Sequence, residues 1–156
     1  MTPRLDPIDR KLLALVQADS SLPYAVLGEA VGLSVSAVNE RVRKLERIGA
    51  IRGYVALLDP AAAGAPVLAF VEIGIAAPGR AEWFFNTVAA RPEVLEAHRT
   101  TGSREFLLKL RASSLARLES LIDEIIGSNA AIAATRVTLV LHSAKDSPVL
   151  PVNEAG

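Results

Sequence analysis

The sequence of 156 residues contains no cysteine. This absence excludes disulfide frameworks, thiolate zinc sites, iron–sulfur clusters and cysteine nucleophiles, and it fits a reducing cytoplasm. No uncharged apolar run reaches the roughly 18 residues that a membrane span needs, and the first residues carry no apolar signal core. The net charge is zero, with 17 basic and 17 acidic side chains. Bulk charge therefore does not predict a nucleic-acid-coating protein, whereas a local basic face is still compatible with DNA binding.

Motifs typical of enzymes are also missing. The sequence has no Gly-x-Gly-x-x-Gly, no P-loop, no His-Glu-x-x-His and no Gly-x-Ser-x-Gly elbow. His98 and His142 are isolated, which is more typical of structural hydrogen bonds than of a metal site. The sequence therefore predicts no catalytic residue, no metal site and no cofactor.

A proline-bounded run of small residues, 59–66, divides the chain and is typical of a linker. The predicted fold class is α+β, with an N-terminal winged helix-turn-helix joined to a C-terminal ferredoxin-like βαββαβ domain. We expect four parts: a helix-turn-helix domain over 1–52, a hairpin and linker over 53–65, a ferredoxin-like domain over 66–145, and a loose tail over 146–156.

Three short helices are predicted in the first part. Asp6 followed by Pro7 is typical of a helix start. A second helix begins near Pro23 and ends at Gly32, and Ser34 or Ser36 caps a third, which Gly49 ends. Val38, Val42 and Leu45 form one apolar stripe on that third helix. The sequence from Ile51 to Leu57 predicts a short hairpin.

The second part predicts two helices among four strands. The ranges are strand 67–75, helix 80–91, strands 94–100 and 105–111, helix 114–126 and strand 133–141. This order is the split βαβ arrangement, in which both helices cover one face of an antiparallel sheet. On the first strand, Leu68 and Phe70 point away from Val71 and Ile73. Apolar residues on both faces indicate that another subunit covers the open face.

The third helix carries the strongest functional signal, because a tight glycine turn precedes it and its polar face is basic. Arginine and lysine neutralise phosphates and read guanine, and asparagine pairs with adenine. The alternative is a solvent-exposed basic face whose charges pair with Glu40 and Glu46. The glycine turn before the helix and the basic hairpin after it favour DNA binding. The candidate DNA-binding residues are Ser34, Ser36, Ala37, Asn39, Glu40, Arg43, Lys44 and Arg47.

The chain resembles the leucine-responsive/asparagine-operon (Lrp/AsnC) family of transcriptional regulators over about residues 5 to 145. The matching text includes Asp9-Arg10-Lys11-Leu12-Leu13, Val31-Gly32-Leu33-Ser34, Arg41-Val42-Arg43-Lys44-Leu45-Glu46, Gly53-Tyr54, Pro92-Glu93-Val94, and His98 with Thr101-Gly102. The resemblance implies double-stranded DNA as a partner. It also implies a homodimer that assembles further, to an octamer, and binds an amino acid or organic acid between dimers. Two alternatives are a haem-pathway decarboxylase of the same fold and a ligand sensor that does not bind DNA.

The resemblance also implies an effector site at His98, Thr100, Thr101, Gly102, Ser103 and Arg104. The family usually has an aspartate directly after Thr-Gly and a second one two residues later, whereas this chain has Ser103-Arg104-Glu105. The usual Pro-Gly before the last strand is replaced by residues 129–132. Two hypotheses follow for the effector. In the first, the protein binds a carboxylate-bearing or otherwise anionic ligand through Arg104 and the turn amides, or has only weak affinity for neutral amino acids. In the second, Arg104 faces water and the site is empty.

Overall fold

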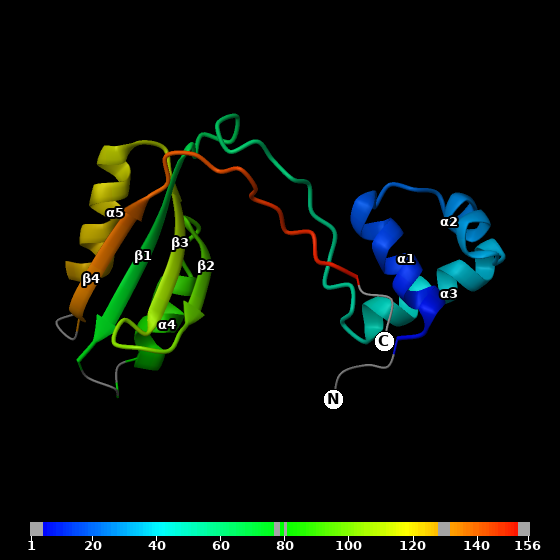
Figure 1. Ribbon diagram of the computed structural model, residues 1–156, viewed down its shortest axis with the longest axis horizontal. Helices are drawn as coiled ribbons and strands as arrows, with labels where there is room; N and C mark the ends of the chain where they lie inside the picture. The colour runs from blue at the N-terminus through cyan, green and yellow to red at the C-terminus, as the bar shows by residue number, and fades with distance from the viewer. Residues whose placement is uncertain (1–4, 77–78, 80, 128–131, 153–156) are drawn as a thin grey trace. The chain divides into compact units, whose positions relative to one another are not determined.

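The computed structural model describes residues 5–76, 79, 81–127 and 132–152 and contains two compact units (Figure 1). One unit comprises Met1–Ala56 together with Lys145–Gly156, and the other comprises Leu57–Ala144. Arg80, where the sequence predicts a helix start, and residues 129–131, which replace the family's Pro-Gly, lie outside the described residues. Within them, no helix has the length and apolar character needed to cross a membrane.

Three helices form the N-terminal unit, as predicted: α1 (Pro7–Ala18), α2 (Tyr24–Val31) and α3 (Val35–Arg47). Asp6 caps α1, because its side chain accepts a hydrogen bond from the Asp9 amide at 2.7 Å. Gly32 ends α2 with φ 72°, a left-handed conformation that glycine adopts without steric cost. The apolar residues of the three helices meet in one core of Leu12, Leu27, Val38, Val42 and Leu45.

The predicted hairpin after α3 is wrong. Residues 51–59 form no strand, and the chain runs on as an extended segment into the linker. Alternating apolar residues predicted pairing, but no neighbouring strand of the described chain lies beside them. Val55, Leu57 and Leu58 are 82%, 71% and 72% exposed as a result.

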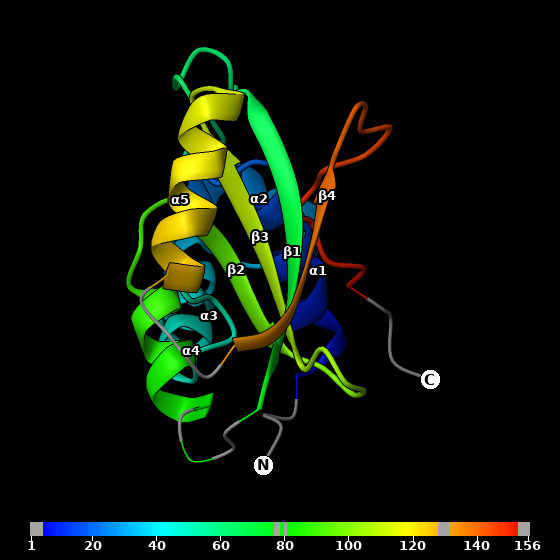
Figure 2. The same ribbon diagram turned by 90° about the vertical axis from the view of Figure 1, so that its left-hand side faces the viewer.

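A four-stranded antiparallel sheet forms the C-terminal unit, in the order β2-β3-β1-β4. Its elements are β1 (Val67–Ile75), α4 (Ala81–Ala89), β2 (Val94–Arg99), β3 (Phe106–Ala112), α5 (Leu115–Gly127) and β4 (Ile132–Leu139). Both helices lie on the same face of the sheet (Figure 2). The predicted split βαβ topology is confirmed.

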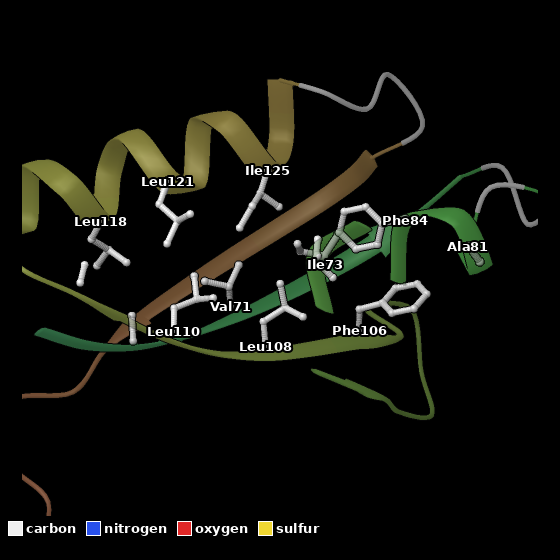
Figure 3. Close-up of a cluster of buried hydrophobic side chains, with 13 residues drawn as sticks. Val71, Ile73, Ala81, Phe84, Phe106, Leu108, Leu110, Leu118, Leu121 and Ile125 are labelled. Atoms are coloured by element: carbon white, nitrogen blue, oxygen red, sulfur yellow. The ribbon is translucent and has the colours of Figure 1, made fainter. Parts of the chain in front are cut away.

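The core of this unit lies between the helices and the sheet. Leu118, Leu121 and Ile125 of α5 point toward the sheet residues Val71 and Leu110 (Figure 3). At the other end, the rings of Phe84 and Phe106 meet edge to face, with centroids 5.4 Å apart. Phe84 is therefore a core residue, whereas its neighbour Trp83 is half exposed.

The open face of the sheet is more polar than the first strand alone predicts. Cross-strand pairs place Phe70 opposite Lys109 and Thr138, and Leu68 opposite Arg111. Leu68 is only 6% exposed within the single chain. Leu68 is therefore covered within its own chain, and the expectation that another subunit covers the open face stays a prediction. Phe70 is half-buried, and it is the apolar residue of β1 that a partner subunit could cover on the open face.

The C-terminal segment returns to the N-terminal unit. The Gln17 side chain at the end of α1 donates to the Leu150 carbonyl at 2.8 Å and accepts from the Leu150 amide at 2.9 Å. These two hydrogen bonds hold Leu150 at α1, although the described residues 145–152 form no helix or strand. They also explain why this segment groups with the N-terminal unit.

Candidate nucleic-acid interface and effector turn

The turn between α2 and α3 is held by backbone contacts. The Leu33 amide donates to the Gly28 carbonyl at 2.9 Å, and the Ser34 hydroxyl accepts from the Ala37 amide at 3.3 Å. Ser34, not Ser36, is therefore the cap of α3. A Cβ on Gly28 would lie 2.5 Å from the Leu33 carbonyl oxygen. Glycine at this position allows the turn to pack directly on α2.

Four exposed side chains form a line on α3, which we call the α3 stripe: Ser36, Glu40, Arg43 and Arg47. They are spaced four, three and four residues apart, so they share one helix face. Ala37 and Asn39 flank the stripe and are half-buried. The stripe lies opposite Val38, Val42 and Leu45, whose burial fixes α3 against the unit.

Lys44 lies away from the stripe, beside Arg41, and both side chains contact α1. The Lys44 amine lies 2.8 Å from one carboxylate oxygen of Asp9, and the Arg41 guanidinium lies 2.7 Å from the other. Arg41 also binds the Asp6 carboxylate at 2.6 Å. Asp9 is fully buried, whereas Lys44 and Arg41 keep 43% and 28% of their side-chain exposure.

The contacts keep Asp9 ionised in spite of its burial. Burial raises the pKa of Asp9, but the hydrogen bonds from Lys44 and Arg41 outweigh it and hold the pKa below its usual value. The hydrogen bonds that Arg41 donates to Asp6 and Asp9 raise the pKa of Arg41. The two cations are therefore the charges that compensate a buried carboxylate, and they are not equivalent to Arg43 and Arg47.

The extended segment after α3 is anchored to it by one side chain. The Tyr54 hydroxyl donates to a Glu46 carboxylate oxygen at 2.9 Å. Burial, followed by this hydrogen bond and the Glu46 charge, raises the pKa of Tyr54 to about 12. Tyr54 therefore fixes where the chain leaves the helix-turn-helix.

The candidate effector residues lie at the β2–β3 turn. The Thr100 amide donates to the Glu105 carbonyl at 2.6 Å, and the Thr100 hydroxyl donates to the Arg104 carbonyl at 3.2 Å. Gly102 has φ 106°, and residues 100–103 are exposed. The Ser103 carbonyl packs on Gly74 of β1, where a Cβ would lie 2.5 Å from it.

Charged pairs surround this turn. Arg104 lies 3.7 Å from Glu72 of β1, and its buried Nε has no hydrogen-bond partner among the described residues. Glu105 binds Arg99 at 3.0 Å instead. His98, on β2, contacts Glu96 at 3.2 Å, and this hydrogen bond and that from Lys109 hold the pKa of Glu96 low.

Two acidic residues at these sites were missed by sequence reasoning. In the sequence, Asp9 is typical of a first-turn acid of a helix, and Glu72 of a polar position on a strand. Each meets its basic partner only through tertiary packing across more than 30 residues, so no local spacing signals the contact.

The helix-turn-helix and the α+β unit together define a class, the transcriptional regulators that join DNA binding to ligand binding in one chain.

Comparisons with known proteins agree with this class. Residues 5–46 match the AsnC-type helix-turn-helix domain, and residues 68–150 match the Lrp/AsnC ligand binding domain. The chain therefore belongs to the Lrp/AsnC family of DNA-binding transcriptional regulators. It is 32% identical over 148 residues to the HTH-type transcriptional regulator FL11 of Pyrococcus horikoshii, covering 95% of this chain and 97% of FL11.

Solved structures show the same fold across both units. An AsnC family transcriptional regulator from Agrobacterium tumefaciens superposes with a TM-score of 0.89 at 32% identity, covering 95% of this chain and 97% of that one. A transcriptional regulator from Neisseria meningitidis, solved as a complex with L-Met, has a TM-score of 0.88 at 30% identity, covering 96% and 98%.

Proposed function

We propose that the α3 stripe enters the DNA major groove and reads the operator of this regulator. The observation that carries the proposal is the line of four exposed polar side chains behind a rigid glycine turn. Arg43 reads a base edge, Arg47 neutralises phosphate, and Ser34, Ser36, Ala37, Asn39 and Glu40 line the contact. Lys44 is left out because its amine compensates Asp9.

Arg43→Ala is expected to weaken binding to the operator by roughly 1–3 kcal/mol and to relax specificity at one base position. The reason is that a bidentate arginine–guanine contact discriminates among bases, whereas a phosphate contact does not. Fluorescence anisotropy with the operator and with each single-base variant measures both effects. Equal losses on every sequence would assign Arg43 to phosphate and contradict its proposed role.

We further propose that the chain works as a homodimer that assembles to a higher oligomer. Two features support this: Phe70 on the open sheet face, and the exposed Val55, Leu57 and Leu58 on an extended segment without a partner strand in the described chain. Apolar surface of this kind is typical of an interface. A two-fold dimer presents two α3 helices about one DNA turn, roughly 34 Å, or a multiple of it apart.

The effector that we propose carries a carboxylate and binds at the β2–β3 turn between subunits. Arg104 and the exposed turn 101–103 offer positive charge and donors, with His98 and Thr100 nearby. Glu72, 3.7 Å from Arg104, supplies the acid that the Ser103 position lacks. This acid makes an amino acid an acceptable ligand beside organic acids, as L-Met is for the Neisseria relative.

Arg104→Ala is expected to weaken binding of the carboxylate ligand about 10- to 100-fold, since a hydrogen bond to a charged group contributes roughly 1.5–3 kcal/mol. Calorimetry against the twenty amino acids and a panel of organic acids identifies the ligand and measures the change. Arg99→Ala is the matched control, because Arg99 pairs with Glu105. This variant should change the affinity for the ligand less than twofold. Tight leucine binding that Arg104→Ala leaves intact would contradict the proposal.

The rival functions are a haem-pathway decarboxylase and a sensor that does not bind DNA. The relatives from Pyrococcus, Agrobacterium and Neisseria are transcriptional regulators, which favours regulation without catalysis. A Soret band in the purified protein would favour the decarboxylase, and a DNA selection without any motif would favour the sensor.

Since its target is DNA and the chain has no cysteine, we place the protein in the cytoplasm.

A further inference from the structure

The basic residues on α3 form two groups with different contacts. The helix carries Arg41, Arg43, Lys44 and Arg47. Arg43 and Arg47 are exposed on the α3 stripe, whereas Arg41 and Lys44 point to α1 and share the buried carboxylate of Asp9. The basic charge of the helix is therefore divided between two faces, one for DNA and one for the fold.

We infer that Asp9 is a specificity-determining residue, which withholds Lys44 from the DNA phosphates and thereby limits sequence-independent binding. The inference rests on the proposed role of the α3 stripe. Asp9 touches no DNA in this proposal, so it acts as a positioning residue through Lys44 and Arg41.

The geometry distinguishes the two cations. Arg41 keeps a second partner, Asp6 at 2.6 Å, when Asp9 is neutralised, so it stays at α1. Lys44 has Asp9 as its salt-bridge partner and already exposes 43% of its side chain. Its flexible four-carbon stem lets the amine turn toward a phosphate once the carboxylate charge is gone. Removing the Asp9 charge therefore frees Lys44, whereas Asp6 retains Arg41.

The consequence for binding follows from counterion release. Each phosphate that a cation neutralises steepens the fall of log K with log salt by about 0.9. This attraction raises the affinity for operator and for random DNA by the same factor. It therefore also raises binding to the many competing non-specific sites on a genome. A regulator that holds Lys44 back keeps its non-specific affinity low, and the base contacts of the stripe then decide where it binds.

The experiment compares four variants of the full chain with the wild type on random duplex, titrated with salt. Arg47→Met is expected to reduce the salt slope by about one per bound subunit, and Lys44→Met to leave it unchanged. Asp9→Asn is expected to steepen the slope by about one per bound subunit and to raise affinity for random DNA several-fold. The double variant Asp9→Asn/Lys44→Met should return the slope to the wild-type value, which a merely structural loss cannot do.

Each outcome decides a separate point. If Arg47→Met does not change the slope, the docking of α3 on DNA fails, and the inference fails with it. If Arg47→Met reduces the slope and Lys44→Met reduces it equally, DNA docking stands but Lys44 is not withheld. An Asp9→Asn protein that folds, by circular dichroism, with an unchanged slope also overturns the inference. If Asp9→Asn does not fold, the comparison of Lys44→Met with Arg47→Met decides alone.

Discussion

Gly28→Ala is expected to weaken operator binding at least tenfold while the C-terminal unit stays folded. The added Cβ would lie 2.5 Å from the Leu33 carbonyl oxygen, a backbone atom that cannot rotate away. Alanine would favour the helix by roughly 0.5–1 kcal/mol over glycine, but overpacking costs roughly 1–3 kcal/mol and here displaces backbone. Relief of the clash moves the turn, and with it the start of α3.

The measurement is operator affinity by anisotropy together with thermal unfolding of the full chain. We expect at least a tenfold loss of operator affinity and a lower melting temperature of the N-terminal unit. Gly127→Ala is the matched control, because a Cβ on Gly127 meets no atom within 4 Å. If Gly28→Ala kept the operator affinity and the melting temperature of the wild type, the α2–α3 turn would not be a rigid element that positions α3.

Phe70→Asp is expected to dissociate the oligomer. Burying one such side chain contributes roughly 1.5–3 kcal/mol, and a two-fold interface repeats the substitution, so the loss is roughly 3–6 kcal/mol. This corresponds to about a 10²- to 10⁴-fold weaker dimer. The introduced carboxylate would also lie opposite Lys109, but Lys109 already pairs with Glu96 at 3.2 Å, so this contact offsets little of the loss.

Sedimentation at micromolar concentration tests the assembly. We expect the wild type to form oligomers, Phe70→Leu to retain them, and Phe70→Asp to sediment as a monomer with an unchanged circular dichroism spectrum. A wild-type monomer, or an intact Phe70→Asp oligomer, would show that this face of the sheet is not the interface.

Much of the architecture was predictable because it depends on local patterns. The strand 67–75 has the predicted bounds, since a long apolar run that follows Pro66 specifies it. The caps Asp6 and Gly32 define helix ends through backbone hydrogen bonds a few residues away. Periodicity likewise located the buried stripe of α3.

The errors concern contacts between segments far apart in the sequence. The hairpin after α3 failed because strand propensity needs a partner strand, and the described chain provides none there. The contact between Asp9 and Lys44 was also not predicted, because helical spacing cannot show a hydrogen bond across 35 residues. The Gln17–Leu150 contact, across 133 residues, leaves no local signal either.

The central claim is that the α3 stripe reads a specific DNA sequence. The most direct measurement is selection of bound fragments from a random duplex library by the wild type and by Arg43→Ala, followed by sequencing. The proposal predicts an imperfect palindrome with half-site centres one or more DNA turns apart, and loss of preference at one position per half-site in the variant. A wild-type selection that returns no sequence preference over random duplex at moderate salt would contradict it.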